Sequence, residues 1–264
     1  MRPALFLPAC PTDMPVRKPK DGPNGPIFFK AYRAGEFRRL SNLFGPVEWA
    51  FQRQKFKQDT AVYDWLNKGE VWERHGLWDP EQFDEVRTAM KAPGKLESYI
   101  TPEGQIASGI LAKRVSAMVT NPTGDASRHV LKFILGLKKL PTPTEAEEYV
   151  KSVLNPPLSD QAKELFMEGL LMDKFKIPEY RQLLVSTGTR DLHEQSRGGK
   201  PNEWEYYDQP EEKAALGVSN GGDLLGRLMT RVRARLHSPV SNLDPDSDDD
   251  VPLAQLARRQ RLNQ

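Results

Sequence analysis

The sequence predicts an α+β fold in which helices are in the majority, arranged as a single domain with a few short strands. Apolar residues recur at the spacing of a helix face over most of the chain, whereas the alternation typical of strands is confined to short stretches. At 264 residues the chain is long enough to bury one substantial core. Its apolar fraction of 38% and its 22 prolines indicate that part of this length lies outside the core.

The two ends of the chain have the composition of disordered tails. Residues 1–26 hold seven prolines, which fix φ and remove amide donors every few positions. Residues 238–264 combine the acidic run Asp244–Asp250 with a basic, polar terminus. Such segments usually cannot bury enough apolar surface to become ordered, so we interpret both as solvated tails rather than binding segments. The folded domain is therefore expected over 27–237.

The best strand signals lie far apart in the sequence. Ile27–Phe29 is a short apolar run that follows the last proline of the N-terminal tail, and apolar and polar residues alternate around Leu192. Both stretches are only a few residues long. We therefore expect a small sheet in a domain that is mainly helical.

The first helix starts are predicted from capping residues and prolines. Asp79 before Pro80 is expected to open one helix, and Thr101 before Pro102 is expected to open another that runs through Val115. In each pair a side-chain oxygen can cap the free amide groups, and proline fits the first helical position because it has no amide to satisfy.

Three further helices are predicted downstream. Thr144 and Glu147 have the spacing of a capping box, and Ser159 is the expected N-cap of a helix that extends to Phe175. The last helix has one apolar face, formed by Leu224, Leu225, Leu228, Met229, Val232 and Leu236. Its arginines, at positions 227, 231, 233 and 235, take other angles and are expected on a solvated face.

Composition excludes several classes of function. A formal net charge of +2 is far from the excess of a dedicated nucleic-acid coat or a polybasic membrane binder. Cys10 is the single cysteine, and four scattered histidines give no support to a metal centre. No stretch approaches the roughly 18–20 apolar residues of a membrane span, and the apolar run before Cys10 is too short for a signal peptide. We therefore expect a cytoplasmic protein with no membrane partner.

The informative motifs lie at the two ends of the folded region, and no glycine-rich phosphate loop, nucleophile elbow or HExxH pair is present. The motifs are, in order, Ser41-Asn42, Glu48-Trp49-Ala50-Phe51-Gln52 with Lys55-Phe56, Lys174-Phe175, Leu183-Leu184-Val185-Ser186-Thr187-Gly188, Leu192-His193-Glu194, Trp204, and Asp223-Leu224-Leu225-Gly226 with Leu228-Met229 and Arg231. No single motif is specific, but the ordered set is.

This ordered set resembles the NADAR superfamily, named for NAD and ADP-ribose chemistry. The family includes an N-glycosidase that acts on riboflavin-pathway intermediates and enzymes that remove ADP-ribose from modified guanine. The resemblance covers 27–56 and 158–236 and implies a similar domain over 27–237. Segment 57–157 is longer than the usual middle of the family, and we interpret it as a helical insertion.

The chain also departs from the family pattern. Between Asn42 and Glu48 it lacks the longer hairpin with a tryptophan-proline pair. The family tryptophan before the lysine-phenylalanine helix falls near Leu158, its aspartate before the loop tryptophan falls on Pro201, and its closing-helix asparagine is Asp223. Either the active residues are relocated into the insertion, or catalysis has been altered or lost.

The resemblance implies a site that cleaves an N-glycosidic bond. Glu48 is the expected catalytic residue, because a carboxylate stabilises the oxocarbenium-like transition state at ribose. The residues expected to bind substrate are Ser41, Asn42, Lys55, Arg114, Glu194, Trp204 and Asp223, and Trp49 is a candidate for stacking on the base. Lys55 and Arg114, together with the amides near Gly222, would bind phosphate.

Local sequence also allows structural roles for the same residues. Glu48 fits the first turn of a helix, Glu194 could pair with a buried arginine, and any of the tryptophans could be core. We therefore expect an N-glycosidase, independent of metal and redox cofactors, that acts on a ribose phosphate or an ADP-ribose conjugate. Its partner would be a small-molecule nucleotide, an ADP-ribosylated nucleobase or a modified nucleic acid.

Two other functions fit the sequence. The first is a catalytically altered module that binds ADP-ribose or a nucleotide without cleaving it. The second is a helical interaction protein that docks a partner through Trp65, Trp72 and Trp78 of the insertion. The interaction protein requires that these tryptophans form an exposed apolar patch rather than pack inward.

Overall fold

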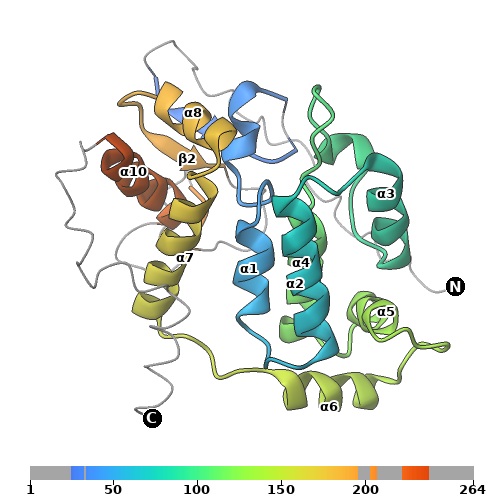
Figure 1. Ribbon diagram of the computed structural model, residues 1–264. Helices are drawn as coiled ribbons and strands as arrows, with labels where there is room; N and C mark the ends of the chain where they lie inside the picture. Colours follow the sequence, from blue (N-terminus) through green and yellow to red (C-terminus); the bar gives the residue numbers. More distant parts are fainter. Residues whose placement is uncertain (1–24, 33, 196–202, 207–221, 238–264) are drawn as a thin grey trace, which may run out of the picture.

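The computed structural model describes residues 25–32, 34–195, 203–206 and 222–237 (Figure 1). Its elements are, in order, β1 (Ile27–Phe29), the 3-10 helix η1 (Glu36–Leu40), α1 (Val47–Arg53), α2 (Ala61–Arg74), α3 (Pro80–Ala89), the 3-10 helix η2 (Leu96–Tyr99), α4 (Gly109–Thr120), α5 (Asp125–Ile134), α6 (Pro143–Val153), α7 (Asp160–Lys174), α8 (Pro178–Ser186), β2 (Leu192–Glu194) and α10 (Leu224–His237). The fold is a mostly helical α+β single domain, as predicted. Almost all of the two predicted tails lies outside the described residues.

The two predicted strands are confirmed, and they pair with each other. β1 and β2 are parallel, with Ile27 opposite Leu192 and Phe29 opposite Glu194. Leu192 and Ile27 are both buried, and α10 packs against β2 (Figure 1). The pairing brings two segments that are more than 160 residues apart in the sequence into direct contact. It therefore joins the two ends of the folded region.

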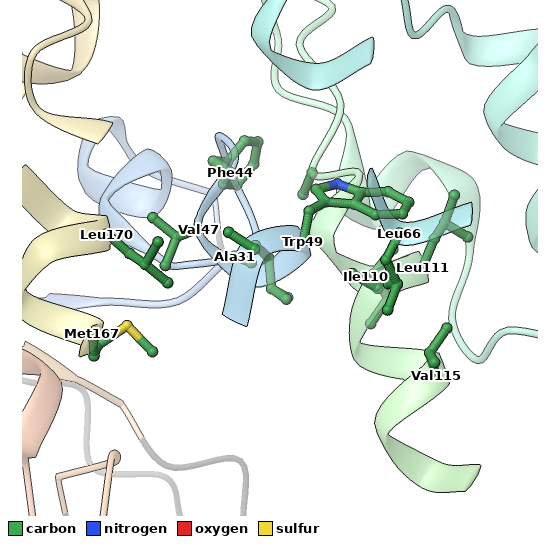
Figure 2. Packing of buried hydrophobic residues seen from close by; sticks show 14 of the residues in the cluster. Ala31, Phe44, Val47, Trp49, Leu66, Ile110, Leu111, Val115, Met167 and Leu170 are labelled. Carbon is green, nitrogen blue, oxygen red and sulfur yellow. The ribbon is translucent and has the colours of Figure 1, made fainter. Parts of the chain in front are cut away.

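Helix α1 is the centre of the packing and lies between α7 and the helices α2 and α4 (Figure 1). Figure 2 shows Trp49 among apolar residues of α2 and α4, whereas Val47 points to the α7 side, towards Leu170. Trp49 has no exposed surface, and its indole Nε1 donates a hydrogen bond of 3.0 Å to the Ser108 hydroxyl. The two sides of α1 thus belong to one continuous core.

Two of the tryptophans of segment 57–157, Trp65 and Trp78, pack inward against Trp49. The Trp49 ring stacks on Trp78 with the centroids 5.7 Å apart, and the Trp65 ring lies 5.1 Å away. Trp72 meets Trp78 edge-on. Trp65 and Trp78 therefore face the core, whereas Trp72 is half-buried beside the exposed Leu77. None of the described helices has the length and apolar character needed to cross a membrane.

The two ends of segment 57–157 lie side by side, just after the end of α1. Phe56 forms an antiparallel bridge with Leu154. The side-chain amide of Asn155 donates hydrogen bonds to the carbonyl oxygens of Gln54 and Phe56, at 2.9 and 2.8 Å. Of the helices between these residues, α2 and α4 nevertheless pack directly on α1, so the segment contributes to the same core.

Two of the predicted helix starts are confirmed and two are wrong. The Asp79 and Ser159 side chains cap α3 and α7 as expected. Thr101 does not open a helix, because the chain there forms a turn closed by a bridge between Ile100 and Ile106, and α4 begins only at Gly109.

The capping box of α6 lies two residues before the predicted one. Thr142 and Glu145 form it, with Pro143 at the first helical position. The prediction at Thr144 and Glu147 had the right spacing but the wrong register, because Pro143 has no amide and fits the first turn better than a place outside the helix.

The apolar face of α10 packs into the core as predicted, but its arginines are not all solvated. Arg233 is 6% exposed, and its guanidinium donates to the Thr187 hydroxyl at 2.7 Å and to the Arg190 carbonyl at 2.8 Å. Arg231 forms an ion pair with the buried Glu168 at 2.9 Å. Arg233 therefore links α10 to the end of α8, and Arg231 links it to α7.

Gly69→Ala is expected to destabilise the fold, although the same change inside a helix usually stabilises by about 0.5–1 kcal/mol. A Cβ at position 69 would lie 2.1 Å from the buried Trp49 ring, so the tryptophan cluster would have to shift. Urea unfolding should show a loss of about 1–3 kcal/mol in the free energy of unfolding. Glu85→Ala, on the exposed face of α3, should change it by less than about 0.5 kcal/mol. A Gly69→Ala protein as stable as wild type would contradict this packing.

Candidate functional site

The loop that carries Ser41 and Asn42 is fixed by Lys174, the last residue of α7. The Lys174 ammonium group is fully buried and donates hydrogen bonds to the carbonyl oxygens of Arg39, Leu40 and Ser41, at 2.9, 3.2 and 2.8 Å. Desolvation lowers the pKa of Lys174 to about 7, opposed by the nearby Glu73 carboxylate. Lys174 thus satisfies carbonyl groups at the end of η1 that have no partner within that helix.

The other end of this loop is held by Glu73 of α2. The Gly45 amide donates a hydrogen bond of 2.9 Å to Glu73 Oε1, and Gly45 has a positive φ of 76° that favours glycine. The second oxygen of Glu73 accepts a hydrogen bond from the Ser108 hydroxyl. Desolvation raises the pKa of Glu73. With both ends fixed, the loop delivers the chain into α1 in one orientation.

Glu48 lies in the first turn of α1 and is 7% exposed. Its Oε1 accepts a hydrogen bond of 2.7 Å from the Gln52 side-chain amide, one turn later. Helix α4 approaches closely here, because a Cβ on Gly109 would lie only 3.0 Å from the Glu48 Cβ. Residues one turn after Gly109 therefore face the same region as Glu48.

Lys113 of α4, four residues after Gly109, is the cation that this approach brings to Glu48. Desolvation lowers the pKa of Lys113, but the carboxylates of Glu48, Glu194 and Glu205 outweigh it and raise this pKa. Lys55, at the end of α1, also interacts with Glu48, but desolvation dominates and lowers the pKa of Lys55. Two lysines and three carboxylates therefore share one region.

Glu194 enters this region from β2. Its Oε1 accepts a hydrogen bond of 3.2 Å from the Ser41 hydroxyl. Desolvation raises the pKa of Glu194 to about 7, with Lys113 opposing the shift and Glu205 adding to it. We call Glu48, Lys55, Lys113, Glu194 and Glu205 the carboxylate–lysine cluster. The sequence predicted three of these five residues, together with Ser41, and the fold brings them together.

Trp204 lies at the Lys55 end of the cluster. Its ring meets Phe51 edge-on at 5.7 Å, and the Lys55 ammonium group lies 5.2 Å from the centroid of the Phe51 ring. Lys163 of α7 lies over the Trp204 ring at 5.9 Å. The prediction that Trp204 lines the site therefore agrees with its position beside the cluster.

Asn42 is the second polar residue of the fixed loop. It is 8% exposed, and its amide nitrogen contacts only the Met167 sulfur, at 3.7 Å, among the residues that the structure describes. Within the same residues, its Oδ1 has no hydrogen-bond partner. Asn42 therefore keeps a buried acceptor next to Ser41, which agrees with its predicted role in binding.

Two predicted site residues lie away from the cluster, and one of these predictions is plainly wrong. Trp49 cannot stack on a base, because its ring is enclosed by Trp65, Trp78 and Gly69. Arg114 was expected to bind phosphate, but it is Lys113 that interacts with Glu48. Arg114 follows Lys113 and points about 100° further around α4.

The Asp223 amide donates a hydrogen bond of 2.9 Å to the carbonyl oxygen of Glu205, but its carboxylate is directed to His193. Its Oδ2 is 2.7 Å from His193 Nδ1, and the His193 ring packs between Phe28 and Tyr206. Because successive side chains of a strand point to opposite faces, His193 and Glu194 lie on opposite sides of β2. The Asp223 carboxylate therefore lies on the His193 side of β2, and its role in substrate binding stays a prediction.

Sequence reasoning missed Lys113 and Glu205. Lys113 stands next to Arg114, and only the contact between Gly109 and Glu48 shows which of the two cations faces the carboxylate. Glu205 follows Trp204, and Tyr206 bridges to Gln195 in parallel. Glu205 therefore takes the same side as Glu194. In the described part of the chain, no group of three or more histidine, cysteine, aspartate and glutamate side chains has the arrangement of a metal site.

Glu194→Gln is expected to change how stability depends on pH. The folded-state pKa of Glu194 is raised to about 7, so its stabilising contribution is complete below about pH 4.5 and is lost as the pH rises through 7. The glutamine keeps the acceptor for Ser41 and stays neutral. Relative to wild type, the variant should therefore gain on the order of 1–3 kcal/mol between pH 5 and pH 8, measured by urea unfolding. If the difference in unfolding free energy between the variant and wild type is the same at pH 5 and at pH 8, the desolvation of this carboxylate is contradicted.

Comparisons with known proteins add no assignment to this geometry. No family model, no curated protein and no solved structure matches the chain.

Proposed function

We propose that the protein is a cytoplasmic N-glycosidase that hydrolyses the bond between a base and the ribose of a ribose phosphate or an ADP-ribose conjugate. The observation that carries the proposal is the convergence of Glu48, Ser41 and Glu194 with two lysines. The same residues, apart from Lys113, are those that the family resemblance singles out. The substrate would be a free nucleotide or an ADP-ribosylated nucleobase, alone or in nucleic acid.

The proposed reaction uses the two carboxylates differently. Glu48 stabilises the positive charge that develops at C1 of ribose and accepts a proton from the attacking water. The C1–N bond breaks, and its electron pair leaves with the base nitrogen. Glu194, with a pKa of about 7, is partly protonated near neutral pH and can donate the proton that this nitrogen needs. The products are the free sugar and the neutral base.

The remaining groups of the site supply binding. Lys55 and Lys113 provide two positive charges for a phosphate or diphosphate group, close to Glu48, the carboxylate that acts at ribose. Trp204, supported edge-on by Phe51, offers the aromatic surface for the base that Trp49 cannot offer. One site would thus hold the base, the sugar and the phosphate.

Glu48→Gln is expected to fold normally and to lose turnover by about 100-fold or more, because it removes the charge opposite the transition state. The glutamine oxygen can still accept the hydrogen bond from Gln52, so the thermal midpoint should change little. The assay incubates the protein with NAD, ADP-ribosylated guanosine and an aminopyrimidine ribose phosphate, and detects released base by mass spectrometry.

Glu81→Gln is the matched control, because Glu81 is also the second residue of a helix but is exposed on α3. It should keep wild-type turnover. Undiminished turnover in Glu48→Gln would refute the role of Glu48. Binding of ADP-ribose by the wild-type protein without release of base from any of the three compounds would refute the glycosidase and favour the binding module.

Lys113→Met is expected to weaken binding of ADP-ribose by about tenfold, because a charge-assisted contact to phosphate would be lost. Arg114→Met is the matched control at the neighbouring position, and it should stay within about twofold of wild type. Titration calorimetry of both variants measures the effect. A larger loss for Arg114→Met than for Lys113→Met would assign phosphate binding to the arginine instead.

A further inference from the structure

Gln52 is hydrogen-bonded to the proposed catalytic carboxylate and is more buried than Glu48 itself. It lies one helical turn after Glu48, and its side-chain nitrogen donates a hydrogen bond of 2.7 Å to Glu48 Oε1. Only 3% of Gln52 is exposed. The bond fixes the orientation of the Glu48 carboxylate, since one of its two oxygens is tied to a residue of the same rigid helix.

The oxygen of the Gln52 side-chain amide has no hydrogen-bond partner among the described residues. This oxygen, Oε1, is a buried acceptor. A buried acceptor without a hydrogen bond lowers the stability of the fold, and native proteins rarely keep one without a reason. Fixing Glu48 does not require it, because any donor on α1 would serve. An acceptor held beside Glu48 is instead suited to a hydrogen-bond donor that arrives with the reaction.

Hydrolysis brings such a donor, because the attacking water carries two hydrogens. If Glu48 accepts one of them, the second needs an acceptor nearby, or the water loses a hydrogen bond as it leaves bulk solvent. Gln52 Oε1 belongs to the side chain that already bonds Glu48. Glu48 and Gln52 can therefore hold one water by both hydrogens and leave an oxygen lone pair directed away from them.

We propose that Gln52 is a further catalytic residue beside Glu48 and Glu194, which orients the attacking water through Oε1 while its amide nitrogen holds Glu48. The inference rests on the proposed N-glycosidase function. The water oxygen forms the new bond to C1, and its first proton passes to Glu48. Its second hydrogen stays on the oxygen and keeps its hydrogen bond to Gln52 Oε1 until the hydroxyl group of the product has formed. The C1–N bond breaks, and its electron pair leaves with the base.

Competition between water and methanol tests this role. Methanol donates only one hydrogen bond, so it needs Glu48 but not Gln52 Oε1, and its methyl group would face the side chain at position 52. In Gln52→Met the ratio of methyl glycoside to free sugar should rise by roughly threefold or more. This ratio compares two products of one reaction, so partial unfolding of the variant does not change it.

The experiment uses the full chain in water–methanol mixtures, with NAD, ADP-ribosylated guanosine and the aminopyrimidine ribose phosphate in parallel. Gln54→Met is the matched control, because it makes the same substitution just beyond the end of α1, two positions away from the residue that bonds Glu48. Its product ratio should equal that of wild type. With water alone, Gln52→Met should lower kcat at least about fivefold and leave KM within about twofold.

Each outcome separates the two proposals. Turnover by wild type with an unchanged product ratio in Gln52→Met overturns the role of Gln52 and leaves the glycosidase intact. A rise in KM without a fall in kcat also overturns it, because Gln52 would then bind the substrate rather than the water. Absence of turnover in wild type with all three compounds overturns the glycosidase and, with it, this inference.

Discussion

One buried ammonium group fixes the geometry of the whole candidate site. Lys174 reaches from the end of α7 to three successive carbonyl oxygens at the end of η1, in a place with no access to water. An isolated charge there would be strongly unfavourable, but the three carbonyls and the carboxylate of Glu73 compensate for its desolvation. Because Ser41 and the start of α1 follow directly, the position of Glu48 depends on this interaction.

The cluster around Glu48 has the opposite character. Glu48 and Glu205 both repel Glu194, and Lys113 interacts favourably with all three carboxylates. Such an arrangement contributes little to stability, since part of each interaction is offset by desolvation. Shifted pKa values in a group of converging charges are typical of sites that bind or transform a ligand. Lys174, by contrast, bonds backbone carbonyl groups and supports the fold, whereas the cluster around Glu48 would carry out the proposed chemistry.

The tryptophans illustrate how far local sequence leads. Trp49 stands beside the proposed catalytic residue in the sequence, yet successive residues of a helix point about 100° apart. Glu48 faces Lys113, whereas Trp49 turns into the core against Gly69. Trp204 lies more than 150 residues from Glu48 in the sequence, next to Glu205, and still lies beside the cluster, in contact with Phe51. Closeness in the sequence was therefore a poor guide to closeness at the site.

Local patterns by themselves determined several elements of this protein. The strands at Ile27–Phe29 and around Leu192, the caps at Asp79 and Ser159 and the apolar face of α10 depend on neighbouring residues, so they could be predicted. The register of a cap was less certain, since two threonines flank Pro143 at similar spacing.

Only the tertiary structure decided which charges meet. Lys113 rather than Arg114 faces Glu48 because Gly109 lets α4 approach α1. Glu194 and His193 divide between the two faces of β2, and this assigns one to Ser41 and the other to Asp223. These choices depend on contacts between segments far apart in the chain, and no local pattern carries that information.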